Sequence, residues 1–368
     1  SVDFKVEASG FGVVNWNGNM SVYSSEAGIT VSNHRVPKLK NFDIFKRKEF
    51  INKDNEKINT IKSLSDDDFS KAKVFISQNC IRHYLFRDEF FGVQKVNNQN
   101  VDDVLSSLSG LIRGFVIAEG NSSFKRKSSL FLEDFLTDFN EAPENNGNVY
   151  FEQFTKSGER NNTSIYSNHN TKNVLYEAYG SISIEDLQFI PLENSFDRSA
   201  YKEIITIDEG NELADKITSY LKSYILLDEY SKLNPLASFG TNFVRLNSIS
   251  KIGEAGIILN NDAILIIVNQ VLEMFKELNF KQGRGSFKVD NIVIDYNDSN
   301  YGMRIKDYLS NNYDNLNLEK EHDYAIYYEN IKIDDSEFNL KMKKMKDSKS
   351  KDKKNKNLEK SNNNEDIN

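Results

Sequence analysis

KVFISQNCIRHYLFR, residues 73–87, predicts a short strand that leads into a helix. The run 73–76 is strand-like, and Ser77 or Asn79 can cap the helix that follows. At about 100° per residue, one side of this helix is apolar and comprises Ile81, Tyr84 and Leu85. The other side carries amide, guanidinium and imidazole donors, on Asn79, Arg82, His83 and Arg87. The helix can therefore bury one face and present hydrogen-bond donors on the other.

The donor-rich face has two interpretations. A helix begins with free backbone N–H groups, so donors near its start suit an anion, and a phosphate best. The simpler interpretation is an amphipathic helix whose basic face is solvated. The choice between phosphate or RNA binding and a solvated face depends on the rest of the chain.

The composition is that of an ordinary soluble protein. The chain has 368 residues, of which 38% are hydrophobic and 28% charged, and this length suits one large domain or two small ones. Cys80 is the single cysteine, so no intramolecular disulfide can form. No apolar run reaches the length of a membrane span, and a basic-then-apolar signal pattern is missing at the start. We expect a cytoplasmic protein without membrane contact.

Charge is distributed unevenly along the chain. The net charge is −8, but residues 341–368 hold ten Lys against five Asp or Glu, so the first 340 residues carry about −13. A protein with this net negative charge does not attract nucleic acid through its overall electrostatic field. A nucleic-acid surface must therefore be a local basic groove on an acidic protein.

The order of expected elements predicts an α+β fold with an RRM-like or ferredoxin-like core. Strand, helix, two strands, helix and strand is the βαββαβ order. This core is shared by enzymes and RNA binders, so it does not decide the function. The expected elements are a strand at Val2–Ala8, helices from Asn79 and over Val101–Phe115, strands between 174 and 207, helices over Asn211–Leu226 and Asp262–Leu278, and a strand at Phe287–Tyr296.

The same order of expected elements predicts one domain over residues 1–334. Insertions at about 19–70 and 120–172 are polar and would project from the sheet as thumb-like or hairpin excursions. Residues 335–368 are rich in Lys and Asn, cannot form a core, and are expected to be a disordered tail.

Catalytic signatures are missing from the sequence. The four histidines lie far apart, and there is no zinc-type spacing, Walker A loop or Gly-x-Ser-x-Gly elbow. The clusters 66–68 and 295–298 are acidic and suit caps and turns. Cys80 suits a small buried hydrophobe better than a nucleophile beside His83. These features favour a binding protein that has no catalytic residues, metal or cofactor.

Several stretches together resemble a known family, the backbone subunit of type I CRISPR surveillance complexes (Cascade) in the RAMP superfamily. The closest resemblance is to the minimal variant of subtype I-F. The stretches that carry it occur in consistent order from near residue 1 to about 307. They are Gly12–Gly18, Ile76–His83, Gly110–Gly114, Tyr179–Glu185, Gly256–Ala263 and Val293–Ser299.

The resemblance implies an RRM-like core with a protruding thumb and a non-catalytic role. It implies several copies that polymerise along the spacer of the CRISPR RNA (crRNA) and present the guide for pairing with target DNA. The implied partners are crRNA, further copies of the chain, the subunit that caps the 5′ handle, the crRNA-processing endonuclease and target DNA.

The physical requirements of a guide holder select the candidate RNA-binding residues. The protein has to grip phosphate and sugar and leave the base edges free, which calls for cations, amides and stacking aromatics. Simpler roles stay open for some of them, such as a loop anchor for Trp16 and a helix C-terminal charge for Arg113. The candidates are Trp16, His34, Lys38, Lys40, Asn79, Arg82, His83, Arg113, Phe124, Lys125, Arg126, Lys127, Arg160, Lys281, Gln282 and Arg284.

Two alternative functions remain at this stage. One is a metal-dependent ribonuclease of the related RAMP kind, which would cut target RNA with a loop aspartate. The other is a structural protein that assembles through its acidic faces and binds no RNA.

Overall fold

The computed structural model of the chain describes residues 1–12, 14–24, 29–40, 45–51, 57–61, 73–87, 101–119, 122–137, 151–157, 162–168, 174–193, 199–201, 205–226, 230–282, 285–298, 302–309, 316–320 and 323–347. Within several of these strands only the backbone is described.

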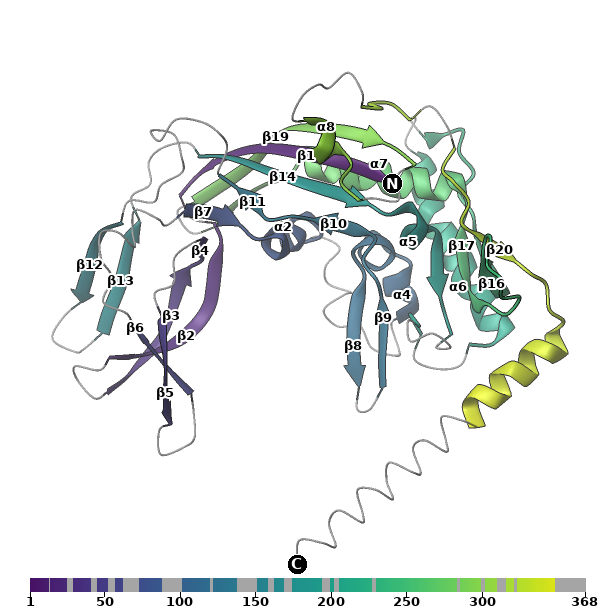
Figure 1. The fold of residues 1–368 in the computed structure, drawn as a ribbon, viewed down its shortest axis with the longest axis horizontal. Coiled ribbons are helices and arrows are strands. Elements are labelled where there is room, and N and C mark those ends of the chain that lie inside the picture. The colour runs from purple at the N-terminus through teal and green to yellow at the C-terminus, as the bar shows by residue number, and fades with distance from the viewer. Residues whose placement is uncertain are drawn as a thin grey trace, which may run out of the picture.

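Eight strands of the described ranges form one arched antiparallel sheet (Figure 1). Its central strand β1 (Val2–Phe11) pairs with β14 (Val174–Ile182) on one side and with β19 (Gly285–Tyr296) on the other. The order is β18–β19–β1–β14–β11–β7–β4, and β10 also pairs with β14. The other strands are β18 (Asn279–Gln282), β11 (Phe135–Leu136), β7 (Lys73–Ile76), β4 (Leu39–Lys40) and β10 (Leu130–Leu132).

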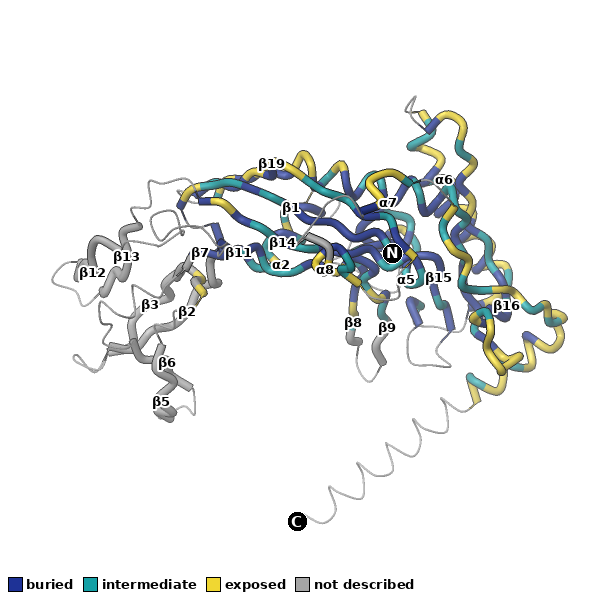
Figure 2. The backbone as a smooth tube through the Cα atoms, turned by 45° about the horizontal axis from the view of Figure 1, so that its top comes forward, coloured by how far each residue is buried: buried dark blue, intermediate teal, exposed yellow. Residues whose placement is uncertain are grey.

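One face of this sheet is apolar and covered by helices. α7 (Asn261–Lys276) begins after Asn260, whose side chain accepts the Ala263 N–H. Its Phe275 ring lies 5.0 Å from that of Phe4 on β1. α2 (Gln78–Leu85) packs on the same face. Residues 2–6 of β1 are all buried, as the dark blue start of this strand in Figure 2 shows, and each large apolar side chain removed from water stabilises the fold by about 1.5–3 kcal/mol.

The opposite face of the sheet is polar and internally paired. Lys5 Nζ lies 2.8 Å from Glu7 and 2.7 Å from Glu177 on the neighbouring strand. The carboxylate of Asp295 is fully buried and accepts two hydrogen bonds from Arg304, at 2.6 and 3.0 Å. Lys5 and Asp295 are therefore paired with groups of opposite charge. Arg304 precedes the short helix α8 (Ile305–Leu309).

A second sheet lies at one end of the arch. Its order is β15–β17–β16–β20, and α6 (Ile207–Lys222) packs against it. Thr206 and Glu209 form a reciprocal capping box at the start of α6. A Cβ atom at Gly210 would lie 2.4 Å from the Phe239 ring, so only glycine allows this close packing. The strands are β15 (Phe189–Pro191), β17 (Glu254–Leu259), β16 (Ala237–Arg245) and β20 (Tyr328–Asn330), with α5 (Ile184–Gln188) before β15 and a 3-10 turn, η3 (Ser223–Leu226), after α6.

Three β structures project from the inner side of the arch (Figure 1). Strands between residues 16 and 61 form a separate sheet of order β3–β2–β6–β5, and the pairs β12–β13 and β8–β9 form ribbons. Residues 130–136, within the excursion expected at 120–172, instead supply β10 and β11 to the main sheet. The projecting strands are β2 (Trp16–Ser24), β3 (Ile29–Pro37), β5 (Phe45–Ile51), β6 (Lys57–Ile61), β8 (Phe115–Glu119), β9 (Ser122–Arg126), β12 (Phe151–Ser157) and β13 (Asn162–Asn168).

The expected α+β class is confirmed, but a ferredoxin-like core is not. The two strands expected between 174 and 207 separate, because β14 joins the arched sheet and β15 joins the second sheet. The helix expected over Val101–Phe115 is also interrupted. It divides into α4 (Val101–Leu105) and a π-helical turn, η1 (Ser109–Arg113).

Serine hydroxyls explain the interruption. The hydroxyls of Ser106 and Ser107 bond back to the carbonyl groups of Asp102 and Val104, which competes with regular helix geometry. The segment then ends at Gly114, whose φ of 72° lies in the left-handed region.

Residues 335–347 form a helix where disorder was expected. Phe338 and Met342 are buried against Ala255, and Lys341 Nζ lies 2.8 Å from the buried Glu193. The i, i+4 spacing of the two apolar side chains supplies a docking face within a lysine-rich sequence. None of the helices in the described ranges has the length and apolar content needed to cross a membrane.

Candidate nucleic-acid interface

α2 lies on the inner side of the arch, between the β2-containing projection and the β8–β9 hairpin (Figure 1). Ile81 and Leu85 are buried, and the ring of Tyr84 stacks on Phe280 of β18 with centroids 3.7 Å apart. The opposite side of the helix is therefore turned away from the sheet. We call this exposed side the α2 face. It comprises Gln78, Asn79, His83 and Arg87.

The first turn of α2 is capped by protein groups. The Ser77 hydroxyl accepts the Cys80 N–H at 3.4 Å, which confirms Ser77 rather than Asn79 as the N-cap. The carboxylate of Asp134 accepts the Gln78 N–H at 2.9 Å. A negative group thus already lies at the helix start, where the sequence suggested a phosphate. An anion bound here would contact the side chains of the α2 face.

Arg82 departs from the expected surface position. Its guanidinium donates to the Ser128 hydroxyl at 2.9 Å and to the carbonyl oxygen of Leu130. These bonds tie α2 to the segment between β9 and β10. Burial, and then the positive charge of Arg113, lower the pKa of Arg82. The side chain holds the helix in place and keeps positive potential beneath the α2 face.

Arg113 brings a second half-buried cation close to Arg82. It ends the π-helical turn η1, and its guanidinium carbon lies 5.9 Å from the centre of the Phe86 ring. Burial lowers the pKa of Arg113. Two neighbouring guanidinium groups of this kind raise the local positive potential, and an anion in contact with both would relieve their repulsion.

Arg126 lies in the protein core, which corrects its assignment as an RNA contact. Its side chain is only 4% exposed. It donates to the carbonyl oxygen of Phe189 at 2.7 Å and to those of Leu111 and Leu187 at 3.3 Å. Burial lowers the pKa of Arg126 to about 10. These bonds leave the guanidinium inaccessible to a nucleic acid.

The two lysines beside Arg126 differ in their surroundings. Lys127 is exposed, and its ammonium group lies 2.8 Å from the carboxylate of Asp186. Lys125 is half-buried, and its backbone N–H donates to the carbonyl of Ser199. Alternation along β9 therefore sends only part of the expected basic cluster outward.

Lys38 and Lys40 lie close to α2. Both side chains are exposed, and β4 pairs with β7, the strand that leads directly into α2. Lys38 Nζ lies 5.9 Å from the centre of the Phe75 ring, and its charge acts on the Cys80 thiol of α2. The structure thus brings these two lysines to the same region as the α2 face.

Lys281 and Gln282 lie on β18, at the other edge of the sheet. Phe280 points toward Tyr84 of α2, so alternation along the strand places Lys281 on the opposite face of the sheet. Lys281 is exposed and Gln282 is half-buried. Lys281 therefore does not join the α2 face.

Five candidate residues lie wholly or in part outside the described residues. Arg160 and Arg284 are outside the described ranges. For Trp16 on β2, His34 on β3 and Phe124 on β9 only the backbone is described. Their proposed contacts with RNA stay predictions.

Sequence reasoning omitted two members of the α2 face from the candidate set. Gln78 is the first residue of the helix, and Arg87 follows His83 by four residues, one turn further along. The helical spacing alone was a sufficient signal for Arg87. Whether Gln78 belongs to the helix depends on where the helix begins. The sequence did not decide this, because both Ser77 and Asn79 can act as the N-cap.

The structure supports a packing role for Cys80. Its Sγ lies 3.8 Å from the carbonyl oxygen of Val14, and burial raises the pKa of the thiol to about 11. A thiol with this pKa is a weak nucleophile at neutral pH. Within the described ranges no group of three or more His, Cys, Asp or Glu side chains is placed to hold a metal ion.

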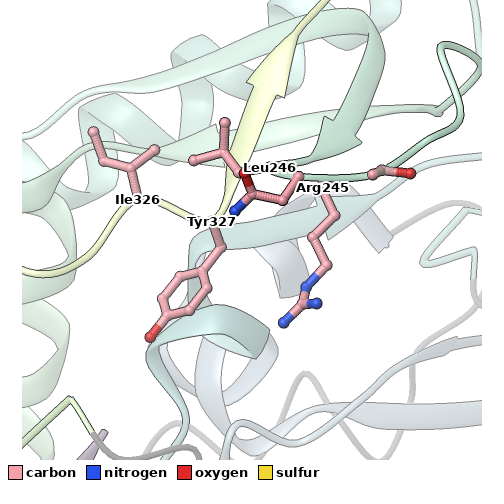
Figure 3. Close-up of a pocket in the computed structure, with 6 residues that line it drawn as sticks. Arg245, Leu246, Ile326 and Tyr327 are labelled. Carbon is pink, nitrogen blue, oxygen red and sulfur yellow. The ribbon is translucent and has the colours of Figure 1, made fainter.

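A pocket of about 490 Å³ lies far along the chain from α2, beside β16 (Figure 3). Arg245 and Tyr327 line it, and Arg245 is bound to Glu185 at 2.7 and 3.1 Å. Its guanidinium is thus already engaged by a carboxylate. None of the candidate RNA-binding residues whose side chains are described lines this pocket.

The geometry defines an α+β protein whose arched sheet carries a helix with exposed amide, imidazole and guanidinium groups on its inner side. A model of the type I-Fv CRISPR-associated protein family Cas7fv-like matches residues 1–331. The chain therefore belongs to the Cas7fv-like family, as the resemblance implied. Membership supports the role of a CRISPR-RNA-binding Cascade backbone subunit of the subtype I-F variant. No curated protein matches the chain.

Proposed function

We propose that this chain is a non-catalytic subunit that polymerises along the spacer of a crRNA in the cytoplasm and presents the guide for pairing with target DNA. Other Cascade subunits, which cap the 5′ handle and process the crRNA, complete the assembly. Family membership over residues 1–331 supports the class of complex. We further propose that β19, β1, β14 and β7, with α2 and α7 on one face, correspond to the RRM-like core of the family.

The observation that carries the proposal is the α2 face. It presents amide, imidazole and guanidinium groups away from the sheet, and α2 itself contains no acidic residue. Such groups bind phosphate and ribose oxygens without distinguishing one base from another. A subunit that serves any spacer needs this kind of contact, because base pairing reads the sequence.

The surroundings of the α2 face favour a polyanion. Lys38 and Lys40 are exposed nearby. The half-buried Arg82 of α2 has the positive charge of Arg113 close to it. Like charges at short range raise the local potential despite the acidic character of the whole body. The guide is therefore expected to lie on the inner side of the arch.

The proposal is tested by purifying the chain from cells that express a CRISPR array. The wild type is expected to retain RNA of defined length. A triple variant of the α2 face, Asn79→Ala, His83→Ala and Arg87→Ala, should retain at least about tenfold less, since a hydrogen bond to a charged group contributes roughly 1.5–3 kcal/mol.

A matched control removes similar groups from another exposed helix face. The control variant carries Asn211→Ala, Ser219→Ala and Lys222→Ala, at three exposed positions of α6. It should leave RNA retention unchanged. Equal retention by the α2 variant and the wild type would remove the α2 face from the RNA-binding surface.

A further inference from the structure

A second, polar pocket lies where the arched sheet meets the second sheet. Its volume is about 540 Å³, within the range of about 300–1,000 Å³ that is typical of small-molecule sites. Phe131 of β10 and Ser181 of β14 line it from the arched sheet, and Arg245 of β16 lines it from the second sheet. The short helix α5 contributes Glu185 and Asp186, and Figure 1 shows this helix between the two sheets. No residue of the α2 face lines the pocket.

The two carboxylates of the pocket are each paired with a cation. Glu185 accepts hydrogen bonds from Arg245 Nε at 2.7 Å and from Nη2 at 3.1 Å. Lys127 Nζ donates to both carboxylate oxygens of Asp186, at 3.0 and 2.8 Å. Together these four side chains carry no net charge. An anion here would meet two carboxylates and a cation would meet two cations, so an uncharged polar ligand suits the pocket best.

The paired groups keep further hydrogen-bonding capacity. Arg245 uses Nε and Nη2 for Glu185, so its Nη1 amino group can donate to another acceptor. Each carboxylate oxygen also has a second lone pair that can accept from another donor. The pocket therefore suits a ligand that carries donors and acceptors side by side on one edge.

An exposed aromatic ring forms one wall of the pocket. Leu130 and Leu132 are buried, so alternation along β10 turns Phe131 to the opposite face of the sheet, where it is 42% exposed. Tyr327 and Arg245 line both this pocket and the one in Figure 3, which shows their two side chains extending to the same side. A flat apolar ring in contact with water offers a stacking surface to a flat ligand.

We propose that this pocket binds one unpaired nucleobase that has an exocyclic amino group, with its ring stacked on Phe131. A base is flat, uncharged, and has donors and acceptors along its edge. A carboxylate accepts from a base amino group, and an arginine donates to the O6 and N7 acceptors of guanine. Guanine satisfies both kinds of group and should bind best, whereas uracil lacks the amino group and should bind most weakly.

This inference goes beyond the proposed function and does not rest on it. α2 packs on the apolar face of the arched sheet, whereas Phe131 points to the other face. A guide held by its phosphates leaves its bases free for pairing, and the pocket takes a base that is not paired. The same chemistry is found in a free nucleotide and in an unpaired base of a strand, and the test separates these two sources.

The test uses the full-length protein prepared without a CRISPR array. In the first arm, ligand-observed NMR compares GMP, AMP, CMP and UMP, which share the same phosphate. GMP should give the strongest saturation transfer and UMP the weakest. In the second arm, fluorescence anisotropy compares a short oligouridine with the same strand carrying one central guanine. The guanine should strengthen binding at least about fivefold, the lower end of the discrimination that a well-paired base edge provides.

Two variants and one matched control locate the site. Phe131→Ala should lower the affinity for the guanine-containing strand by about 5- to 150-fold, the range that corresponds to stacking of one base. Phe11→Ala is the control, because Phe11 is 44% exposed and lies at the end of β1 away from the pocket, and it should leave the affinity unchanged. The double variant Glu185→Gln and Asp186→Asn keeps the shape of the pocket and should reduce the preference for guanine over uracil.

Several outcomes overturn the proposal. They are equal binding of UMP and GMP, no effect of Phe131→Ala, and equal effects of Phe131→Ala and Phe11→Ala. A Phe131→Ala chain that changes self-association in sedimentation but binds nucleotides as the wild type does also overturns it, in favour of a protein contact. Binding of GMP without a gain from guanine in the strand assigns the site to a free nucleotide, and a gain in the strand assigns it to an unpaired base.

The two proposals fail separately. A wild type that retains crRNA but does not distinguish GMP from UMP contradicts the base pocket alone. A wild type that binds GMP through Phe131 but retains no RNA from cells with a CRISPR array contradicts the proposed function alone.

Discussion

Replacing Arg126 by Met separates a structural role from an RNA contact. The guanidinium is fully enclosed and donates to three carbonyl oxygens, those of Phe189, Leu111 and Leu187. The Met side chain fills similar space but removes the guanidinium donor from these acceptors. Each unsatisfied buried acceptor costs about 1–3 kcal/mol, while removal of a buried charge returns several kcal/mol of desolvation cost. We expect a net loss of about 2–4 kcal/mol of unfolding free energy.

Chemical denaturation measures this loss, and RNA retention after purification measures the contact. The control is Lys127→Met on the adjacent residue, which removes an exposed ion pair with Asp186 and should cost no more than about 1 kcal/mol. A stable Arg126→Met chain, within about 0.5 kcal/mol of the wild type, that retains less RNA would refute the placement of Arg126 in the core.

Three further predictions concern other parts of the molecule. Cys80 should react with iodoacetamide about 100-fold more slowly than an ordinary thiol in the native chain and at the ordinary rate in denaturant, because burial raises its pKa from 9.0 to about 11; equal rates would contradict its packing role. Phe338→Ala should undock the helix at 335–347 and speed tryptic cleavage after Lys341, since loss of a buried Phe costs about 3–5 kcal/mol; an unchanged cleavage rate would show that the helix is held without it. The hydrogen bond from Lys5 lowers the pKa of Glu7 below 4.5, so its contribution to stability is present above that pH and is lost as pH falls through the lower value; Lys5→Met should therefore flatten the acid side of the stability profile, and an unchanged profile would show that the pair does not contribute.

The sequence predicted the elements whose periodicity is strong. The helices α6 and α7 lie within a few residues of the expected bounds, because the apolar spacing is regular over both. α2 was recognised for the same reason. The start of α2 was less certain, since both Ser77 and Asn79 can cap a helix.

Tertiary contacts decided what the sequence could not. The sequence predicts one basic cluster at Lys125, Arg126 and Lys127. In the structure the side chain of Arg126 instead points into the core, where it donates to three backbone carbonyl groups. The carboxylate of Asp134 reaches the start of α2 from 56 residues away. No local pattern shows either pairing.

Composition concealed the helix at 335–347. Its many lysines resemble a disordered tail, and only Phe338 and Met342 at i, i+4 spacing signal a docked face. The buried partner Glu193 lies almost 150 residues earlier in the chain, at a separation of 148 from Lys341. The docking surface therefore exists only in the folded protein.

The nucleic acid retained after purification from cells with and without a CRISPR array tests the central claim most directly. The absorbance ratio at 260 and 280 nm, followed by sizing of the extracted RNA, measures it. The account predicts bound RNA of defined length only when the array is expressed, and its loss in the Asn79→Ala, His83→Ala and Arg87→Ala variant. A wild-type chain that stays monomeric and free of nucleic acid in the presence of the array would contradict it.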